Sequence, residues 1–200
     1  MNDKFWSLTK DKQDKMINGS LKVFALNGFR HASTDEIVAE AGISKGLLFH
    51  YFYNKIGLYE FLSEYSARFA LVELNSELRR KESIPLFSLL ESVSRSEASA
   101  MRRYPYLYLF LSTAVRELDD GISANTRESL SLYTERIRAL LEVSVLPESM
   151  PQRDAARIEY YIRLVRTDIM ASLHRNGNLG PEKYLTEASE TILYFEKLFS

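Results

Sequence analysis

The residues best suited to chemistry lie between Ser33 and Lys55, in the stretch STDEIVAEAGISKGLLFHYFYNK. It has the pattern of two short helices joined by a turn at Gly42, and the second helix begins Ser44-Lys45-Gly46. The first turn of a helix has free backbone amides and a partial positive charge, which suit a phosphate oxygen. Lys45 adds a full charge, and Gly46 leaves room for a nucleic-acid backbone. This layout is typical of a helix-turn-helix, which places its second helix in a DNA groove.

Local signals support each part of this unit. Ser33 followed by Glu36 is a capping box, in which each side chain satisfies a backbone amide at the start of the first helix. Gly42 can adopt a left-handed turn conformation, and Ser44 can cap the second helix. Helices this short are marginal alone, so they need the apolar face of a preceding helix over about residues 9–27. The sequence therefore predicts a three-helix unit.

Side-chain spacing separates the two faces of the second helix. Leu48 and Phe52 are four residues apart and are expected to face the core. That leaves Leu47, His50 and Tyr51 open to a DNA groove.

The distribution of charged residues is compatible with nucleic-acid binding but does not by itself indicate it. The net charge is −1, which argues against coating nucleic acid through bulk charge. Residues 1–57 hold eight Lys/Arg and six Asp/Glu, whereas the remainder holds eighteen and twenty-one. The head is thus mildly basic and the body mildly acidic.

Composition indicates a soluble, cytoplasmic protein without a membrane segment. The chain has no cysteine, so disulfides and thiolate metal sites are excluded. Its N-terminus is too polar for a signal peptide, and the apolar run over about 104–115 is too short to span a bilayer. The three histidines are scattered, and no phosphate loop or nucleophile elbow is present. We therefore expect no metal, no cofactor and no enzyme activity.

Helical periodicity dominates the chain, and no alternating strand pattern is evident. We predict an all-α protein of about nine helices, with a helix-turn-helix domain over 1–57 and a helical effector-binding and dimerisation domain over 58–200. The expected helices cover roughly 9–27, 33–41, 44–51, 54–81, 86–102, 105–117, 122–145, 152–176 and 181–199.

About the first third of the chain resembles the DNA-binding domain of TetR-family transcriptional regulators. The resemblance lies in Phe24, Gly28-Phe29, Ile37, Ala41-Gly42-Ile43-Ser44, Gly46, Leu48, Phe52, Lys55 and Leu58. It implies backbone or phosphate contacts at some positions and base contacts at Leu47 and His50. The expected phosphate contacts are Thr34, Ser44, Lys45, Gly46, Tyr51 and Lys55. Phe49 and Val38 depart from the family pattern, and Phe49 lacks the hydroxyl of the tyrosine common at its position.

The resemblance also implies an effector cavity in the second domain. Residues 104–111 are apolar on every face, so their helix should be buried. Aromatic side chains near it either line a cavity or form ordinary core; a cavity would suit a hydrophobic or amphipathic ligand with a few polar anchors. The candidates are Phe61, Tyr65, Phe69, Phe87, Tyr106, Phe110 and Tyr133.

The last two helices have apolar stripes that either dimerise in an intermolecular four-helix bundle or cover the chain's own core. The stripe residues are Ile158, Ile162, Val165, Ile169, Leu185, Ala188, Ile192 and Phe195. We expect a homodimer, because two-fold symmetry places two reading helices about 34 Å apart, one DNA turn.

These features predict a ligand-responsive DNA-binding regulator. We expect a repressor that leaves a palindromic operator when a small hydrophobic or amphipathic effector binds, although activators use the same unit. The alternative is a DNA-bound structural or protein-interaction factor of the same fold that has no effector.

Overall fold

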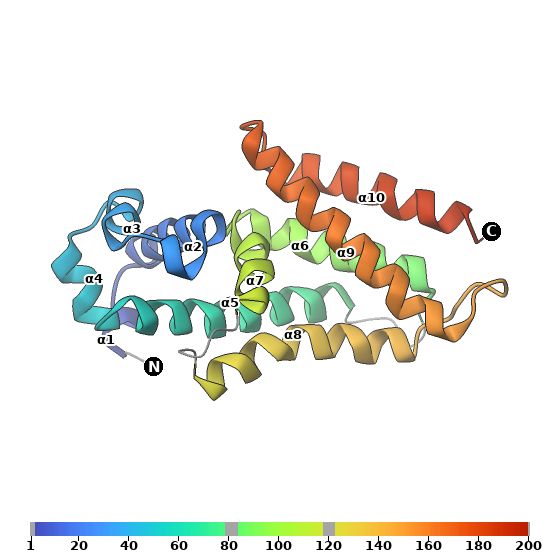
Figure 1. Cartoon of the computed structure of the whole chain (residues 1–200), viewed down its shortest axis with the longest axis horizontal. Helices are drawn as coiled ribbons and strands as arrows, with labels where there is room; N and C mark the ends of the chain where they lie inside the picture. The colour runs from blue at the N-terminus through green and yellow to red at the C-terminus, as the bar shows by residue number, and fades with distance from the viewer. Residues whose placement is uncertain (1–2, 79–83, 118–122, 200) are drawn as a thin grey trace. The chain divides into compact units, whose positions relative to one another are not determined.

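The computed structural model describes residues 3–78, 84–117 and 123–199. This part of the chain contains ten helices (Figure 1). Their bounds are α1 Asp3–Trp6, α2 Lys10–His31, α3 Thr34–Ala41, α4 Lys45–Phe52, α5 Lys55–Leu78, α6 Leu86–Met101, α7 Leu107–Arg116, α8 Ala124–Glu142, α9 Gln152–Arg175 and α10 Pro181–Lys197.

The all-α prediction is confirmed, and the nine expected helices correspond to α2–α10. The short α1 was not expected. The first helix ends its regular part at Gly28, where φ is 69°, and a last turn follows to His31. The expected end at residue 81 and start at residue 122 lie outside the described residues. One isolated parallel bridge joins Pro85 and Val145, and the described residues form no sheet.

The chain divides into two compact units. Unit 1 comprises residues 1–68 and 103–131, and unit 2 comprises residues 69–102 and 132–200. Helices α5 and α8 each contribute residues to both. This division differs from the predicted one at residue 57, because α7 and the first turns of α8 belong with the helix-turn-helix.

In unit 1, α2 packs against both α3 and α7. The contact with α3 is very close, because a Cβ at Gly19 would lie 2.8 Å from Ala41 Cα. Phe24 is fully buried, with Tyr59 at 5.1 Å and Phe110 at 6.3 Å between ring centroids. Residues 107–111 of α7 are buried as predicted, with Leu107 and Phe110 both 0% exposed, whereas Pro105 and Tyr106 are half-buried. Helix α2 is therefore fixed on two sides.

In unit 2, α10 packs against α6 and α9. The core is built from aliphatic side chains of α5, α6, α8, α9 and α10. Its members include Leu74, Leu90, Val93, Ile137, Leu141, Ile158, Ile162 and Ile192. None of the described helices is long and apolar enough to cross a lipid bilayer.

Candidate DNA-binding site

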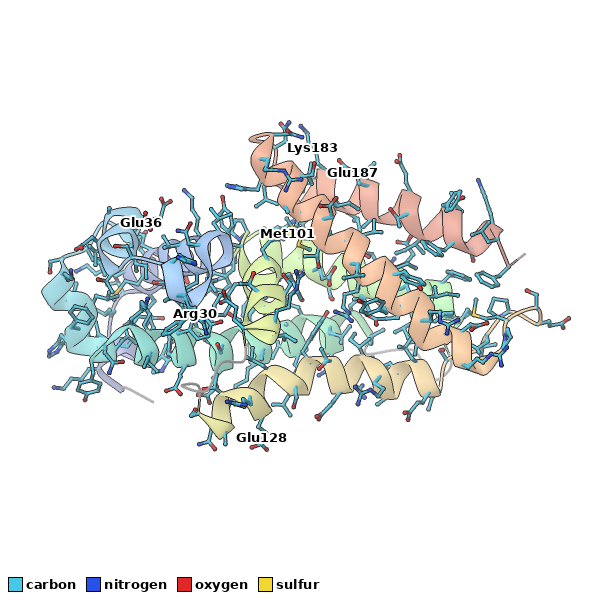
Figure 2. All side chains as sticks on the ribbon, in the orientation of Figure 1. Arg30, Glu36, Met101, Glu128, Lys183 and Glu187 are labelled. Carbon is cyan, nitrogen blue, oxygen red and sulfur yellow. The ribbon has the colours of Figure 1, made fainter. Side chains whose placement is uncertain are left out.

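Helix α3 begins with the predicted capping box. Ser33 Oγ accepts from the Asp35 amide at 3.2 Å, and the Ser33 amide donates to Glu36 Oε2 at 3.5 Å. Glu36, labelled in Figure 2, is in the first turn of α3. Substituting such a cap typically costs about 1 kcal/mol. The turn after α3 is also as predicted, since Gly42 has φ 64° and ψ 38° and ends the helix in the left-handed conformation.

Helix α4, called here the reading helix, begins at an N-cap formed by Ser44. The Ser44 Oγ accepts from the Leu47 amide at 3.2 Å. Next to it, Lys45 Nζ lies 2.8 Å from Asp35 Oδ1, and both side chains are exposed. An exposed ion pair contributes about 0–1 kcal/mol, so Lys45 can exchange Asp35 for a phosphate at little cost.

Neither packing nor backbone conformation requires a glycine at position 46. A Cβ at this position would have no described atom within 4 Å, and its φ is not in the left-handed region. Gly42, by contrast, needs to be glycine because of its positive φ. The open space above Gly46 therefore lies at the N-terminal end of the reading helix, where a phosphate would be held.

The faces of the reading helix largely follow the predicted pattern. Leu48 and Phe52 are buried, at 1% and 5% exposure, while His50 is exposed and Leu47 is half-buried. Tyr51 differs: it is 9% exposed, so it is not open to a groove as the spacing indicated. Of the remaining candidates, Thr34 at the start of α3 is half-buried, and Ser44, Lys45 and Gly46 are exposed.

Tyr51 is buried because the N-terminal helix α1 lies against it. The Phe5 ring is 0% exposed, with its centroid 6.0 Å from that of Tyr51 and 5.3 Å from that of Phe52. Gln13 holds the segment in place by donating to the carbonyls of Trp6 at 3.1 Å and Leu8 at 2.9 Å. Phe5 thus supports the reading helix from its buried side. Its signal in the sequence is the Phe5-Trp6 pair within an otherwise polar N-terminus.

Lys55 has a visible structural role. Its Nζ donates to the carbonyls of Phe29 at 2.8 Å and Ala32 at 3.1 Å, and it lies 4.7 Å from the Phe29 ring centroid. A cation at these carbonyls stabilises the C-terminal end of α2. Lys55 therefore joins the start of α5 to the end of α2, in addition to any contact with DNA.

A second set of contacts, not predicted from the sequence, connects α2 to residues 103–104. Asp14 accepts from Arg103, with Nη2 at 3.0 Å from Oδ2, and from the Tyr104 hydroxyl at 2.8 Å. The Tyr104 hydroxyl is also 2.7 Å from the Tyr65 hydroxyl on α5. Burial raises the pKa of Tyr104, and its bonds to Tyr65 and Asp14 raise it further. These partners are far apart in sequence, so no local pattern could reveal them.

The aromatic residues predicted to share one cavity are instead divided between the units. Phe61, Tyr65, Tyr106 and Phe110 belong to unit 1, and Phe69, Phe87 and Tyr133 belong to unit 2. Phe110 is fully buried between other rings, and Phe87 lies in the unit 2 core. Of the seven, Tyr133 lines a cavity of about 230 Å³ between α8 and α9, within unit 2. Phe87 and Phe110 are therefore core, whereas Phe61, Tyr65, Phe69 and Tyr106 are half-buried.

The predicted dimer residues are also mainly core. Ile158, Ile162, Ile169, Ala188 and Ile192 are all less than 9% exposed, whereas Val165 is 38% exposed. Leu185 and Phe195 are half-buried. Apart from Val165, the exposed apolar side chains of α9 and of the C-terminal part of the chain are different ones, namely Tyr160, Tyr161, Leu164, Leu193, Tyr194 and Leu198. The predicted stripe thus faces inward, and the outward apolar face is offset from it.

Comparison with known proteins agrees with this geometry. Residues 16–62 match the family model for bacterial regulatory proteins of the tetR family. No curated protein sequence matches the chain.

Solved structures match nearly the whole chain. A TetR-like transcriptional regulator from Rhodococcus sp. RHA1 aligns with a TM-score of 0.59 and 16% identity, over 91% of this chain and 93% of that one. The transcriptional regulator FadR from Bacillus subtilis, in complex with stearoyl-CoA, aligns with a TM-score of 0.54 and 16% identity, over 93% and 97%. The superantigen PfiT aligns with a TM-score of 0.53 and 15% identity, over 93% and 96%.

The fold alone does not establish DNA binding, since a superantigen shares it. The matched segment, residues 16–62, contains the capped α3, the Gly42 turn and the whole reading helix. By this segment and by its fold, the chain is similar to the tetR family of bacterial regulatory proteins.

Proposed function

We propose that the chain is a ligand-responsive repressor that binds a palindromic operator as a homodimer. The observation that carries the proposal is the N-terminal end of the reading helix, where Ser44, Lys45 and Gly46 are exposed and Gly46 meets no other part of the protein. A phosphate there would accept from the free amides of the first turn. Thr34 adds a hydroxyl at the start of α3, and His50 and Leu47 would contact base edges.

Two further residues act mainly on the position of the reading helix. Lys55 is held by the carbonyls at the end of α2, and Tyr51 is buried against Phe5. We propose that both orient α4, and that any phosphate contact they make is secondary. Modest charge on this face means that affinity depends on placing two reading helices one DNA turn apart.

The homodimer is supported by the outward apolar face of α9 and α10. Tyr194 on α10 and Leu198 directly after it are 65% and 59% exposed, and contiguous exposed apolar side chains mark interaction surfaces. A second copy related by a two-fold axis would cover the same face on both chains. The pair of helices from each copy would then form a four-helix bundle.

The effector response is supported by the cavity between α8 and α9 and by the relative that binds stearoyl-CoA with the same fold. A ligand releases DNA only if it binds better to the conformation that has lower operator affinity. The protein would work in the cytoplasm, by binding rather than by catalysis.

Fluorescence anisotropy with DNA from upstream of the chain's own gene tests the proposal. We expect saturable binding that unrelated duplex DNA displaces poorly. The affinity should fall steeply as the salt concentration rises. The variants Lys45→Ala and His50→Ala should reduce affinity, whereas Lys12→Ala on the exposed face of α2 should not. A folded dimer that binds no duplex specifically at low salt would overturn the proposal.

A further inference from the structure

A buried ion pair lies beside the cavity between α8 and α9. Arg166 lines the cavity and is 2% exposed, and its Nε lies 3.5 Å from Glu97 Oε2. Glu97 is 5% exposed and also accepts from the Tyr184 hydroxyl. Burying two charges costs several kcal/mol per ion, and an apolar pair of similar volume often serves stability equally well. The pair is therefore weak evidence for a stabilising role.

Arg166 has donors beyond those its neighbours use. A guanidinium carries five N–H groups, and among the described residues Arg166 makes one hydrogen bond, from Nη1 to Ser94 Oγ at 3.4 Å. Its Nε is buried and makes none, although Glu97 is near. A buried guanidinium with spare donors beside a cavity is suited to an acceptor that enters the cavity.

Two more arginines lie on the cavity wall. Arg163, one turn before Arg166 on α9, donates from Nε to Glu159 Oε1 at 3.2 Å, and Arg138 approaches from α8. These three guanidinium groups are balanced by Glu159, which also lines the cavity, and by Glu97 beside Arg166, so one positive charge is left over. A site of this balance favours an anion and disfavours a cation.

The rest of the wall is apolar or aromatic and sets the size of the ligand. Tyr133, Ile137 and Leu141 contribute from α8, and Ala156 and Tyr160 from α9. The volume of about 230 Å³ equals roughly eight waters at about 30 Å³ each, so the cavity holds a group of about eight to twelve non-hydrogen atoms. That volume is far too small to enclose a long-chain acyl-CoA.

We propose that this cavity binds a compact organic carboxylate with an aromatic or short aliphatic body, held by Arg163 and Arg166. The carboxylate takes the spare donors of Arg166 and competes with Glu159 for Arg163 in a bidentate pair. Arg138 adds charge at the opposite wall, and Tyr133 and Ile137 cover the apolar body. This assignment rests on the proposed effector response for its regulatory meaning, but the binding itself does not depend on it.

Isothermal titration calorimetry on the full chain without DNA tests the binding. The probes are matched acid and amide pairs, namely benzoate with benzamide, phenylacetate with phenylacetamide, and hexanoate with hexanamide. We expect at least one acid to bind at least about tenfold more tightly than its amide, because only the acid forms charge-assisted hydrogen bonds. Equal affinity within each pair, or no binding of any acid at 10 mM (about the weakest Kd worth measuring), overturns the proposal.

Variants locate the site. Arg163→Gln and Arg138→Gln should each weaken the binding acid by about tenfold, while Arg157→Gln, on the same helix but outside the cavity, should leave it unchanged. Ala156→Leu removes no charge and fills the cavity, so it should abolish binding of acid and amide alike. If an acid binds the Arg163→Gln and Ala156→Leu variants with the same affinity as the unaltered chain, the proposed site is wrong.

Anisotropy with operator DNA then separates this inference from the proposed function. Acid binding that leaves operator affinity unchanged would support the carboxylate site and overturn the effector response. Specific DNA binding by a chain that binds no acid would leave the regulator intact and overturn the site.

Discussion

The backbone amide of Phe29, at the end of α2, donates a hydrogen bond to Glu117 Oε2 just beyond α7, at 2.7 Å and across 88 residues of sequence. Gly28 precedes this amide with φ 69°, and a Cβ there would collide with the same carboxylate. The end of α2 is therefore fixed by Glu117 on one side and by Lys55 on the other. The orientation of the helix-turn-helix depends on both.

Glu117→Ala should destabilise the protein by about 2 kcal/mol, because it removes a hydrogen bond to a charged acceptor and leaves the Phe29 amide without it. Urea unfolding followed by circular dichroism measures the change. The exposed neighbour Arg116 is the control, and Arg116→Ala should stay within about 0.5 kcal/mol of the unaltered protein. Equal stability of the two variants would contradict the role given to Glu117.

Gly42 and Gly46 should respond to alanine in opposite ways. Gly42→Ala is expected to cost about 1–2 kcal/mol of stability, because φ is 64° and a Cβ is strained there. Gly46→Ala should leave stability equal or slightly higher, since nothing lies within 4 Å and alanine favours helix. Thermal unfolding measures both.

Gly46→Ala should nevertheless bind operator DNA more weakly, because its Cβ occupies the space reserved for the DNA backbone. Anisotropy on the folded variant measures the affinity. Unchanged affinity would show that the DNA backbone does not approach Gly46 closely.

Phe5→Ala should lower stability by about 3 kcal/mol, because Phe5 is fully buried among Tyr51, Phe52 and Phe61. It should also weaken DNA binding at temperatures where the variant remains folded, since the reading helix loses its support. Phe5→Leu keeps most of the apolar volume and should recover part of both losses. A loss of stability with full DNA affinity would restrict Phe5 to packing.

Alkaline pH should unfold the protein through its buried tyrosines. Burial raises the pKa of Tyr59, Tyr104 and Tyr184 above the usual value of about 10. The folded state therefore holds these protons more tightly than the unfolded chain. The corresponding stability is fully present below pH 10, the unfolded value, and is lost as the pH rises above it.

Absorbance at 295 nm should show exposed tyrosines ionising first and the buried ones only together with unfolding. The Tyr104→Phe variant should lose stability less steeply above pH 10, because it has one tyrosine of raised pKa fewer. The Tyr53→Phe variant, at an 81% exposed site, should behave as the unaltered chain does. Ionisation of all tyrosines before unfolding would contradict the prediction.

Leu164→Glu and Leu193→Glu should each shift the homodimer toward monomer, because each places a charge in the outward apolar face of α9 and α10. Sedimentation velocity over a range of concentrations measures the shift. The control is Val72→Glu on α5, a 61% exposed apolar position outside that face. A dimer unaffected by either leucine variant would mean that another surface forms it.

The helix-turn-helix could be predicted because its determinants are local. Ser33, Glu36, Gly42 and Ser44 each act within four residues, and the structure shows each cap and turn where the sequence placed it. The spacing of apolar residues along each helix is also local, so it predicted which helix faces point inward.

Contacts between distant segments could not be predicted in this way. The apolar stripe that contains Ile158 and Ile162 predicted a buried helix face. The spacing of apolar residues alone does not show whether the chain's own core or a second chain covers that face. The Asp14–Arg103 contact joins groups that a sequence pattern treats as ordinary surface charges. The cavity depends on Arg166 turning inward, which exposed arginines of the same helix do not do.

Unit 1 is made of two separate stretches of the chain, and this affects how such a regulator could acquire a different DNA-binding unit by recombination. A recombination point at residue 57 would leave the transplanted head without Arg103, Tyr104 and Glu117, and so without the groups that hold Asp14 and Phe29. Two separate stretches of the gene, covering residues 1–68 and 103–131, would have to move together. New operator specificity would therefore arise more readily by substitutions on the reading helix than by gene fusion.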